Sequence, residues 1–85
     1  MFKPVKTHKK FTDIHGDEHI PVITLQERGV RTKTCHIVID EDCYVVYIEA
    51  EGVIGFVPTH YLFPEVHAAL ATLPPLNDTM AVKSA

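Results

Sequence analysis

Histidine and cysteine have the most reactive side chains in this sequence, and several of them lie close together along the chain. Six histidines occur in 85 residues, and His15 and His19 flank the acidic segment 16–18. Imidazole and carboxylate groups at such short spacing are ligands that zinc or nickel accepts. Further candidate ligands are Cys35, His36 and Cys43.

A structural zinc site usually shows its ligands as recognisable pairs, and this sequence lacks them. There is no CxxC motif, and the His-x-x-x-His pair of His15 and His19 falls in an expected loop, where spacing fixes no geometry. Scattered surface histidines explain the pattern better than a metal site does. We therefore predict neither a bound metal nor another cofactor.

The two cysteines could supply a thiolate nucleophile beside His36 or His60. No Gly-rich loop or suitable helix start accompanies them to bind an oxyanion. A disulfide needs Cα atoms within ~7 Å, and a short hairpin would pair Cys35 nearer Val46 than Cys43. We expect two free thiols, with Cys35 buried, and a protein that is not an enzyme.

A basic N-terminal arm contrasts with an acidic remainder, and the net charge is −3. The arm carries Lys3, Lys6, Lys9 and Lys10 together with His8. It could attract nucleic acid or an acidic partner over long range, although domains that bind nucleic acid usually carry a basic face. A nucleic-acid-associated regulator is therefore the alternative functional hypothesis and not the leading one.

Length and composition favour one compact domain over residues 1–73, followed by a disordered tail over 74–85. No stretch approaches the ~18 apolar residues of a membrane span. The lysine-containing start of the chain lacks the apolar block of a signal peptide, so we expect a cytoplasmic protein that does not contact a membrane.

Alternation of apolar and polar residues predicts three central strands, over 33–39, 43–50 and 53–57. The acidic residues 40–42 form the first expected hairpin connection. The second is the turn at 51–52, where Gly52 supplies a positive φ. Side chains expected to face the core are Tyr44, Val46, Ile48, Ala50, Cys35, Ile37 and Ile39, and those expected to face outward include Val45, Tyr47, Thr34, His36 and Val38.

The flanking elements are a further strand over 20–26 and a helix over 64–73. Pro21 removes a ladder donor, which is typical of an edge strand or a strand start. Pro64 suits the first helical position, and Glu65 lies where a negative charge favours the helix dipole. An additional first strand is expected within 1–5 or 11–14, before a polar loop at 15–19.

Residues 49–62 resemble the end of an SH3 domain. In that family a distal hairpin is followed by Gly, two apolar residues, Pro, a small residue, a polar residue, Tyr and an aliphatic residue. The matching positions here are Gly55, Phe56, Val57, Pro58, Thr59, His60, Tyr61 and Leu62. The resemblance implies a mainly β fold, a small SH3-like barrel of about five strands, to which the short C-terminal helix is an addition.

The resemblance also implies a binding face. Val45 stands where the family usually has its groove tryptophan, and Phe56, Pro58 and Tyr61 match groove-forming positions. Asp13, Asp17 and Glu18 would supply the acidic loop that contacts basic ligand residues. SH3 domains bind proline-rich peptides in aromatic grooves, but this sequence has no tryptophan and has His60 in place of the turn asparagine.

The leading hypothesis is a small non-enzymatic protein-interaction module, an adaptor or inhibitor that binds a protein partner through an exposed barrel face. A compact chain with little besides a single domain also fits an accessory factor encoded by a phage or mobile element. A homodimer formed through the outer face of residues 43–57, or through the helix, is a third hypothesis. The expected binding residues are Val45, Tyr47, Phe56, Pro58, His60, Tyr61, Asp17 and Glu18.

Overall fold

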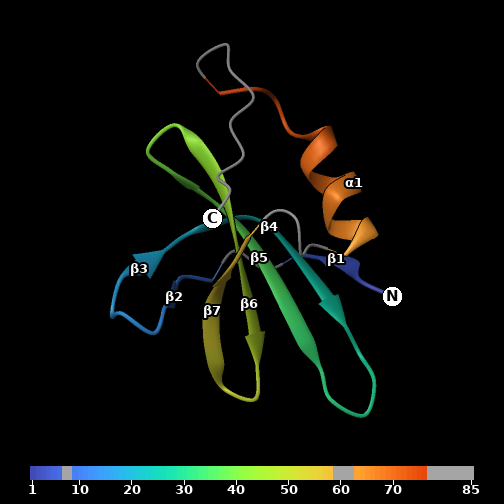
Figure 1. Ribbon diagram of the computed structural model, residues 1–85. Coiled ribbons are helices and arrows are strands. Elements are labelled where there is room, and N and C mark those ends of the chain that lie inside the picture. The colour runs from blue at the N-terminus through green and yellow to red at the C-terminus, as the bar shows by residue number, and fades with distance from the viewer. Residues whose placement is uncertain (7–8, 59–62, 77–85) are drawn as a thin grey trace.

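The computed structural model describes residues 1–6, 9–58 and 63–76, and within them the chain is mainly β (Figure 1). An antiparallel sheet has the strand order β1-β4-β5-β6-β7. Its strands are β1 (Lys3–Val5), β4 (Pro21–Glu27), β5 (Lys33–Asp40), β6 (Cys43–Ala50) and β7 (Val53–Val57). A separate hairpin pairs β2 (Phe11–Thr12) with β3 (Glu18–His19), and the helix α1 spans Pro64–Thr72.

Both hairpins predicted for residues 33–57 form, and each has a two-residue turn. Between β6 and β7, Glu51 and Gly52 have φ values of 54° and 81°, the left-handed pair that matches the twist of antiparallel strands. Between β5 and β6, Glu41 has a φ of 55°. Asp40 belongs to the strand and not to the turn, which makes this connection one residue shorter than expected.

That shorter turn changes the expected register. Cys35 pairs with Ile48, which is nearer to Val46 than to Cys43 along β6, as predicted, but lies two positions beyond Val46. Moving one residue out of a turn shifts every pairing along the ladder. The prediction of two free thiols with Cys35 buried is confirmed.

The sheet is open within the described residues. Strand β1 pairs with β4 and strand β7 pairs with β6, and neither has a second strand beside it in the part of the chain that the structure describes. The mainly β prediction is therefore confirmed, whereas closure into a barrel stays a prediction.

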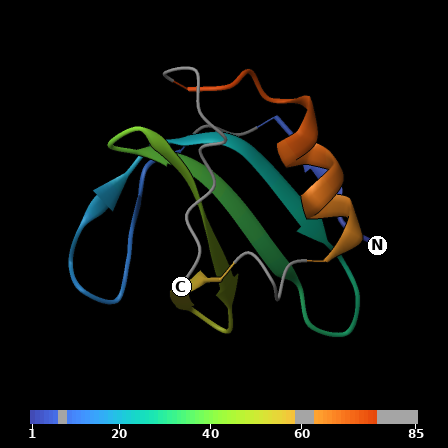
Figure 2. The ribbon, with the colours of Figure 1, turned by 45° about the horizontal axis from the view of Figure 1, so that its top comes forward.

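One face of the sheet packs against α1 (Figure 2). Val66 is the buried residue of the helix, and it joins Ile37 and Val46, both also fully buried, in the main core. The helix begins at Pro64, and the Glu65 carboxylate accepts a hydrogen bond of 2.8 Å from the backbone N–H of Phe2. This bond ties the start of the chain to the helix.

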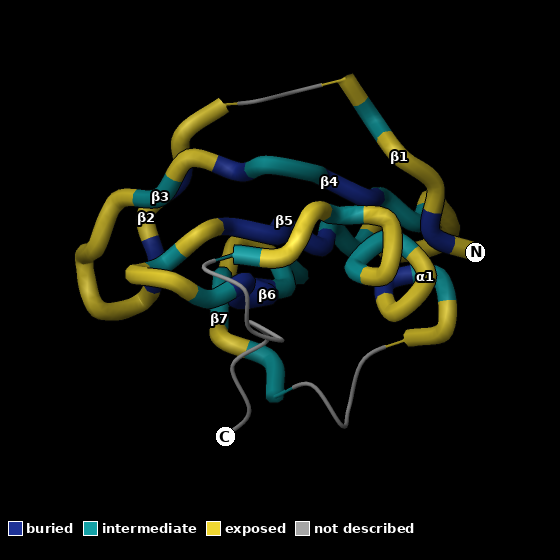
Figure 3. Tube along the Cα trace, turned by 90° about the horizontal axis from the view of Figure 1, so that it is seen from above, coloured by how far each residue is buried: buried dark blue, intermediate teal, exposed yellow. Residues whose placement is uncertain are grey.

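The opposite face is also covered, which the alternation pattern did not reveal. The β2–β3 hairpin lies across it, and Figure 3 places the hairpin and α1 on opposite sides of the sheet. A second core forms there from Phe11, Val38, Val45 and Tyr47. The expectation that Val45 and Tyr47 are exposed was wrong, since they are only 2% and 8% accessible. Val38 and His36 are likewise buried although they were expected to face outward.

Ile39 departs from the prediction in the other direction. It was expected in the core with Cys35 and Ile37, but it is 49% exposed. Strand β4 begins at Pro21, which pairs with Val38, so the last two residues of β5 extend beyond β4. Ile39 consequently lies at the margin of the sheet.

Candidate binding groove

The loop of the β2–β3 hairpin is built around the side chain of Asp13. Its Oδ1 accepts hydrogen bonds from the backbone N–H groups of His15 and Asp17, at 2.8 and 3.0 Å. Backbone bonds from Asp13 N–H to the Asp17 carbonyl and from Gly16 N–H to the Asp13 carbonyl close the turn. A short carboxylate that binds nearby backbone groups is a common way to order such a loop, and Gly16 adopts the positive φ that it needs.

The same carboxylate also holds His19. Asp13 Oδ2 lies 2.8 Å from His19 Nε2, and both side chains are largely buried. This bond to His19, together with the backbone N–H donors, holds the pKa of Asp13 below its ordinary value although burial acts in the opposite direction. The hairpin therefore depends on an ionised Asp13.

We expect the substitution Asp13→Ala to loosen the hairpin and to lower the thermal unfolding midpoint by several degrees. Because the pKa of Asp13 is lower in the folded chain, its contribution is present above the unfolded pKa near 3.8 and is lost as the pH falls through the folded value. Wild type should therefore lose stability below about pH 4, and the variant should show a shallower decline.

The measurement is thermal unfolding followed by circular dichroism between pH 2 and 7. Asp42→Ala, a carboxylate removed from the exposed β5–β6 turn, is the control. Glu65 should keep part of the acid dependence in both variants, because the N–H of Phe2 also lowers its pKa. Equal acid profiles for wild type and Asp13→Ala would contradict the assigned role.

Aromatic rings of the β2–β3 hairpin pack against aromatic rings of the sheet. The ring of Phe11 stacks on His36 at a centroid distance of 4.4 Å and meets the edge of Tyr47 at 5.5 Å. The ring of His19 lies 4.6 Å from that of Tyr47. His19 is thus fixed between a carboxylate and an aromatic ring.

The buried histidine on the sheet is also satisfied by polar partners. His36 Nε2 lies 3.1 Å from Glu49 Oε1, and its Nδ1 lies 3.4 Å from the Thr24 hydroxyl. Among residues 1–6, 9–58 and 63–76, no three histidine, cysteine, aspartate or glutamate side chains are grouped to hold a metal ion.

Burial raises the pKa of Cys35 to about 12, so this thiol stays protonated at neutral pH.

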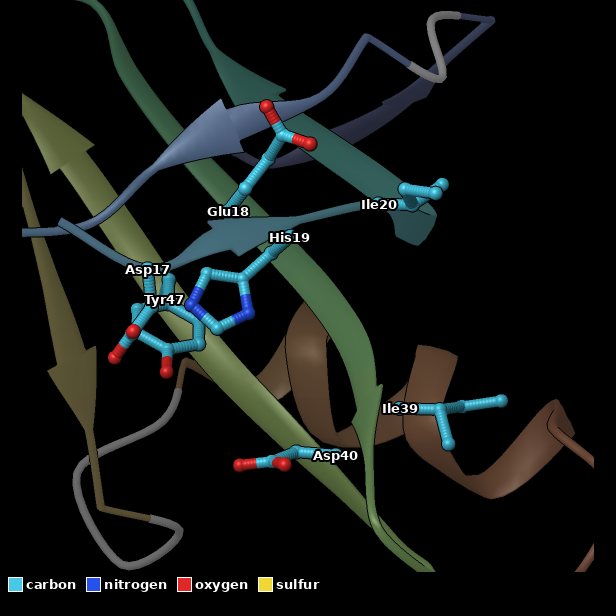
Figure 4. A pocket seen from close by; sticks show the side chains of 7 residues that line it. All are labelled: Asp17, Glu18, His19, Ile20, Ile39, Asp40 and Tyr47. Carbon is cyan, nitrogen blue, oxygen red and sulfur yellow. The ribbon is translucent and has the colours of Figure 1, made fainter.

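A groove of about 460 Å³ opens beside the hairpin, at the end of the sheet where β5 extends beyond β4. It is lined by Asp17, Glu18, His19, Ile20, Ile39, Asp40 and Tyr47. Figure 4 shows the carboxylates of Asp17 and Asp40 directed to the same side as the Tyr47 hydroxyl, whereas Ile20 and Ile39 point the other way. The groove therefore has an acidic end and an apolar end.

The negative charge of the groove acts on Tyr47. Burial is the main cause that raises the pKa of its hydroxyl. Further increases come from the carboxylates of Asp13, Asp40 and Asp17. At the rim, Glu18 lies 3.7 Å from Lys10 Nζ, but both are exposed and such a pair adds little stability. A cationic group that entered the groove would meet several carboxylates.

The structure brings together three of the predicted site residues, namely Asp17, Glu18 and Tyr47. Phe56 is 39% exposed and its ring meets that of Tyr47 at 6.3 Å, so it lies beside this group. Val45 is buried beneath the hairpin, and Pro58 follows β7 in a half-buried position. His60 and Tyr61 lie outside the described residues.

Sequence reasoning missed four residues that line the groove, which are His19, Ile20, Ile39 and Asp40. A signal for two of them was present in the sequence. Ile20 and Ile39 are apolar residues next to Pro21 and Asp40 at strand ends, where a side chain often lacks a covering strand. In the structure Ile20 is 60% exposed and Ile39 is 49% exposed, as is typical of side chains at uncovered strand ends.

Comparisons of the chain with protein-family models, with curated proteins and with solved structures found no match. Within the described residues, no helix has the length and apolar character needed to cross a membrane.

Proposed function

We propose that this protein is a small non-enzymatic interaction module whose groove binds a segment of a partner protein that combines a basic side chain with an apolar one. The observation that carries the proposal is the composition of the groove. Asp17 and Asp40 supply carboxylates at one end, while Ile20 and Ile39 present exposed apolar surface at the other. Exposed apolar surface rimmed by polar groups is typical of protein-binding sites.

Arginine suits this arrangement particularly well. Its guanidinium pairs with carboxylates in a fixed geometry, and its apolar stem can cover a neighbouring hydrophobic side chain. Lysine offers the same charge with less directional bonding. A single groove of this size offers a small contact area, and small interfaces usually bind with moderate affinity. The module would therefore act as an adaptor, or as an inhibitor that contacts its target over a small area.

The groove favours a general basic segment over a polyproline helix. Polyproline recognition uses several aromatic side chains, and Tyr47 is the aromatic ring in the lining of this groove. The fold hypothesis that accompanies the proposal is still the SH3-like barrel. The proposed binding mode does not require closure.

The experiment selects ligands from a library of random peptides displayed on phage and measures the affinity of the selected peptides by fluorescence anisotropy. We expect the selected peptides to contain arginine or lysine next to an aliphatic or aromatic residue. The substitution Asp40→Lys should weaken binding about tenfold or more, because it turns an attraction into a repulsion.

The matched control is Glu51→Lys. It makes the same change of charge in the β6–β7 turn, outside the groove lining, and should leave the affinity within about twofold. Selected peptides without basic residues, or equal losses in the two variants, would overturn the proposal. An RNA or DNA oligonucleotide that binds with steep salt dependence, together with failure to select any peptide, would favour the regulator hypothesis instead.

A further inference from the structure

The two edges of the open sheet differ in how they discourage pairing with another strand. The β1 edge carries Lys3 and Pro4, with Lys6 just beyond it, and lysine and proline at an edge prevent association. The β7 edge has the sequence VIGFV, without a charge or a proline inside the strand, and Pro58 follows directly after it. Within the described residues no strand pairs with its outer side. An edge of this kind is a template for another strand.

The register determines which backbone groups of β7 face that open side. Ala50 and Val53 flank a two-residue turn, and the residues that flank such a turn exchange both of their hydrogen bonds. Hydrogen-bonded and non-hydrogen-bonded pairs alternate along an antiparallel ladder. The N–H and C=O groups of Ile54 and Phe56 are therefore directed away from β6.

Gly55, between these two residues, has no explanation among the residues that the structure describes. Its φ lies outside the positive region that favours glycine, and a Cβ built there would meet no atom within 4 Å. Glycine inside a strand costs stability, and it often marks the place where another backbone approaches closely. The missing side chain leaves room for another backbone to lie close to β7 at this position.

We propose that two copies of the protein pair through β7, antiparallel, about a two-fold axis at Gly55. In this register Ile54 of each copy lies opposite Phe56 of the other, and these are the residues with outward-directed backbone groups. The two glycines then form the non-hydrogen-bonded pair, in which Cα atoms approach to about 4.5 Å. The result is one continuous sheet through both copies.

A second copy fits this edge because of charge and side-chain chemistry. A two-fold axis places each strand against itself, so any charge within β7 would meet a like charge, and β7 has none. Phe56 is 39% exposed in the single chain and would be covered by Ile54 of the other copy. Aromatic and aliphatic residues that pair across strands stabilise antiparallel sheets.

Sedimentation velocity between about 5 and 500 μM tests the dimer, a range that covers weak edge-to-edge association. Wild type should shift from monomer to dimer over this range. Phe56→Lys and Phe56→Glu should each raise the dimer dissociation constant at least tenfold, because like charges then lie near each other across the axis. An equimolar mixture of the two variants should recover dimer, since the charges are now opposite.

Val30→Lys is the control for surface charge, because Val30 is fully exposed in the β4–β5 turn and should not affect association. Circular dichroism establishes that each variant is folded. A second readout is amide hydrogen exchange, where the amides of Ile54 and Phe56 should become protected as protein concentration rises. Wild type that stays monomeric at 500 μM, or dimers that persist equally in both Phe56 variants, would overturn the proposal.

The dimer does not depend on the proposed groove, since none of the groove residues lies in β7. Asp40→Lys should leave the sedimentation of the protein unchanged. Peptide binding can therefore fail while the dimer remains, and the reverse is also true.

Discussion

Replacing Phe11 with alanine should lower the free energy of unfolding by about 3–5 kcal/mol, as for other large aromatic residues in cores. Phe11 is the buried apolar side chain of the β2–β3 hairpin, and it contacts His36, Tyr47 and His19. Without it the two-residue strands have little to hold them to the sheet. Since a domain of this size has a total stability on the order of 5 kcal/mol, most of that stability would be lost.

Urea unfolding followed by circular dichroism measures the change, with Ile14→Ala as the matched control. Ile14 belongs to the same hairpin but is 64% exposed, so its removal should cost less than about 0.5 kcal/mol. The groove gives a further readout, because Asp17 and His19 are placed by the same hairpin. A cost below about 1 kcal/mol for Phe11→Ala would mean that the hairpin does not form a second core.

The sequence was a good guide to the central strands because their information is local. Alternating residues and short turns indicate β5, β6 and β7, and each of these signals spans only a few positions of the chain. The predicted ranges 43–50 and 53–57 match the structure. The helix was predicted with similar accuracy, over 64–73 against Pro64–Thr72, because Pro64 marks its start.

The cover over the second face could not be predicted in the same way. Strands β2 and β3 contain two residues each, which is too short for a period of two to be recognised. Alternation assigned Val45 and Tyr47 to one face of β6 but held no information about what packs there. Their burial depends on contacts with Phe11, more than thirty positions away along the chain.

The groove was predictable only in part for a related reason. The acidic character of Asp17 and Glu18 is visible in the sequence, and both were expected to contact a ligand. The contribution of Ile39 and Asp40 depends on where β4 begins relative to β5. The β5–β6 turn is one residue shorter than predicted, and its length sets the register of β5 against β6.

Ile37 and Ile39 offer the clearest test of that account, because they are identical residues two positions apart on one strand. Ile37 is fully buried under α1 beside Val46 and Val66, whereas Ile39 is half exposed in the groove. Ile37→Ala should lower the free energy of unfolding by about 2–5 kcal/mol, since it opens a cavity that the sheet and helix cannot fill.

Ile39→Ala should cost less than about 1 kcal/mol in the same urea titration, because Ile39 stays 49% exposed after folding. It should instead weaken the binding of selected basic peptides about threefold to tenfold, through the loss of apolar contact. Alternation alone assigns both residues to the core and therefore predicts two equal losses of stability. A large difference in stability, together with weaker peptide binding in Ile39→Ala, would show that the end of β4 converts a core position into a binding position.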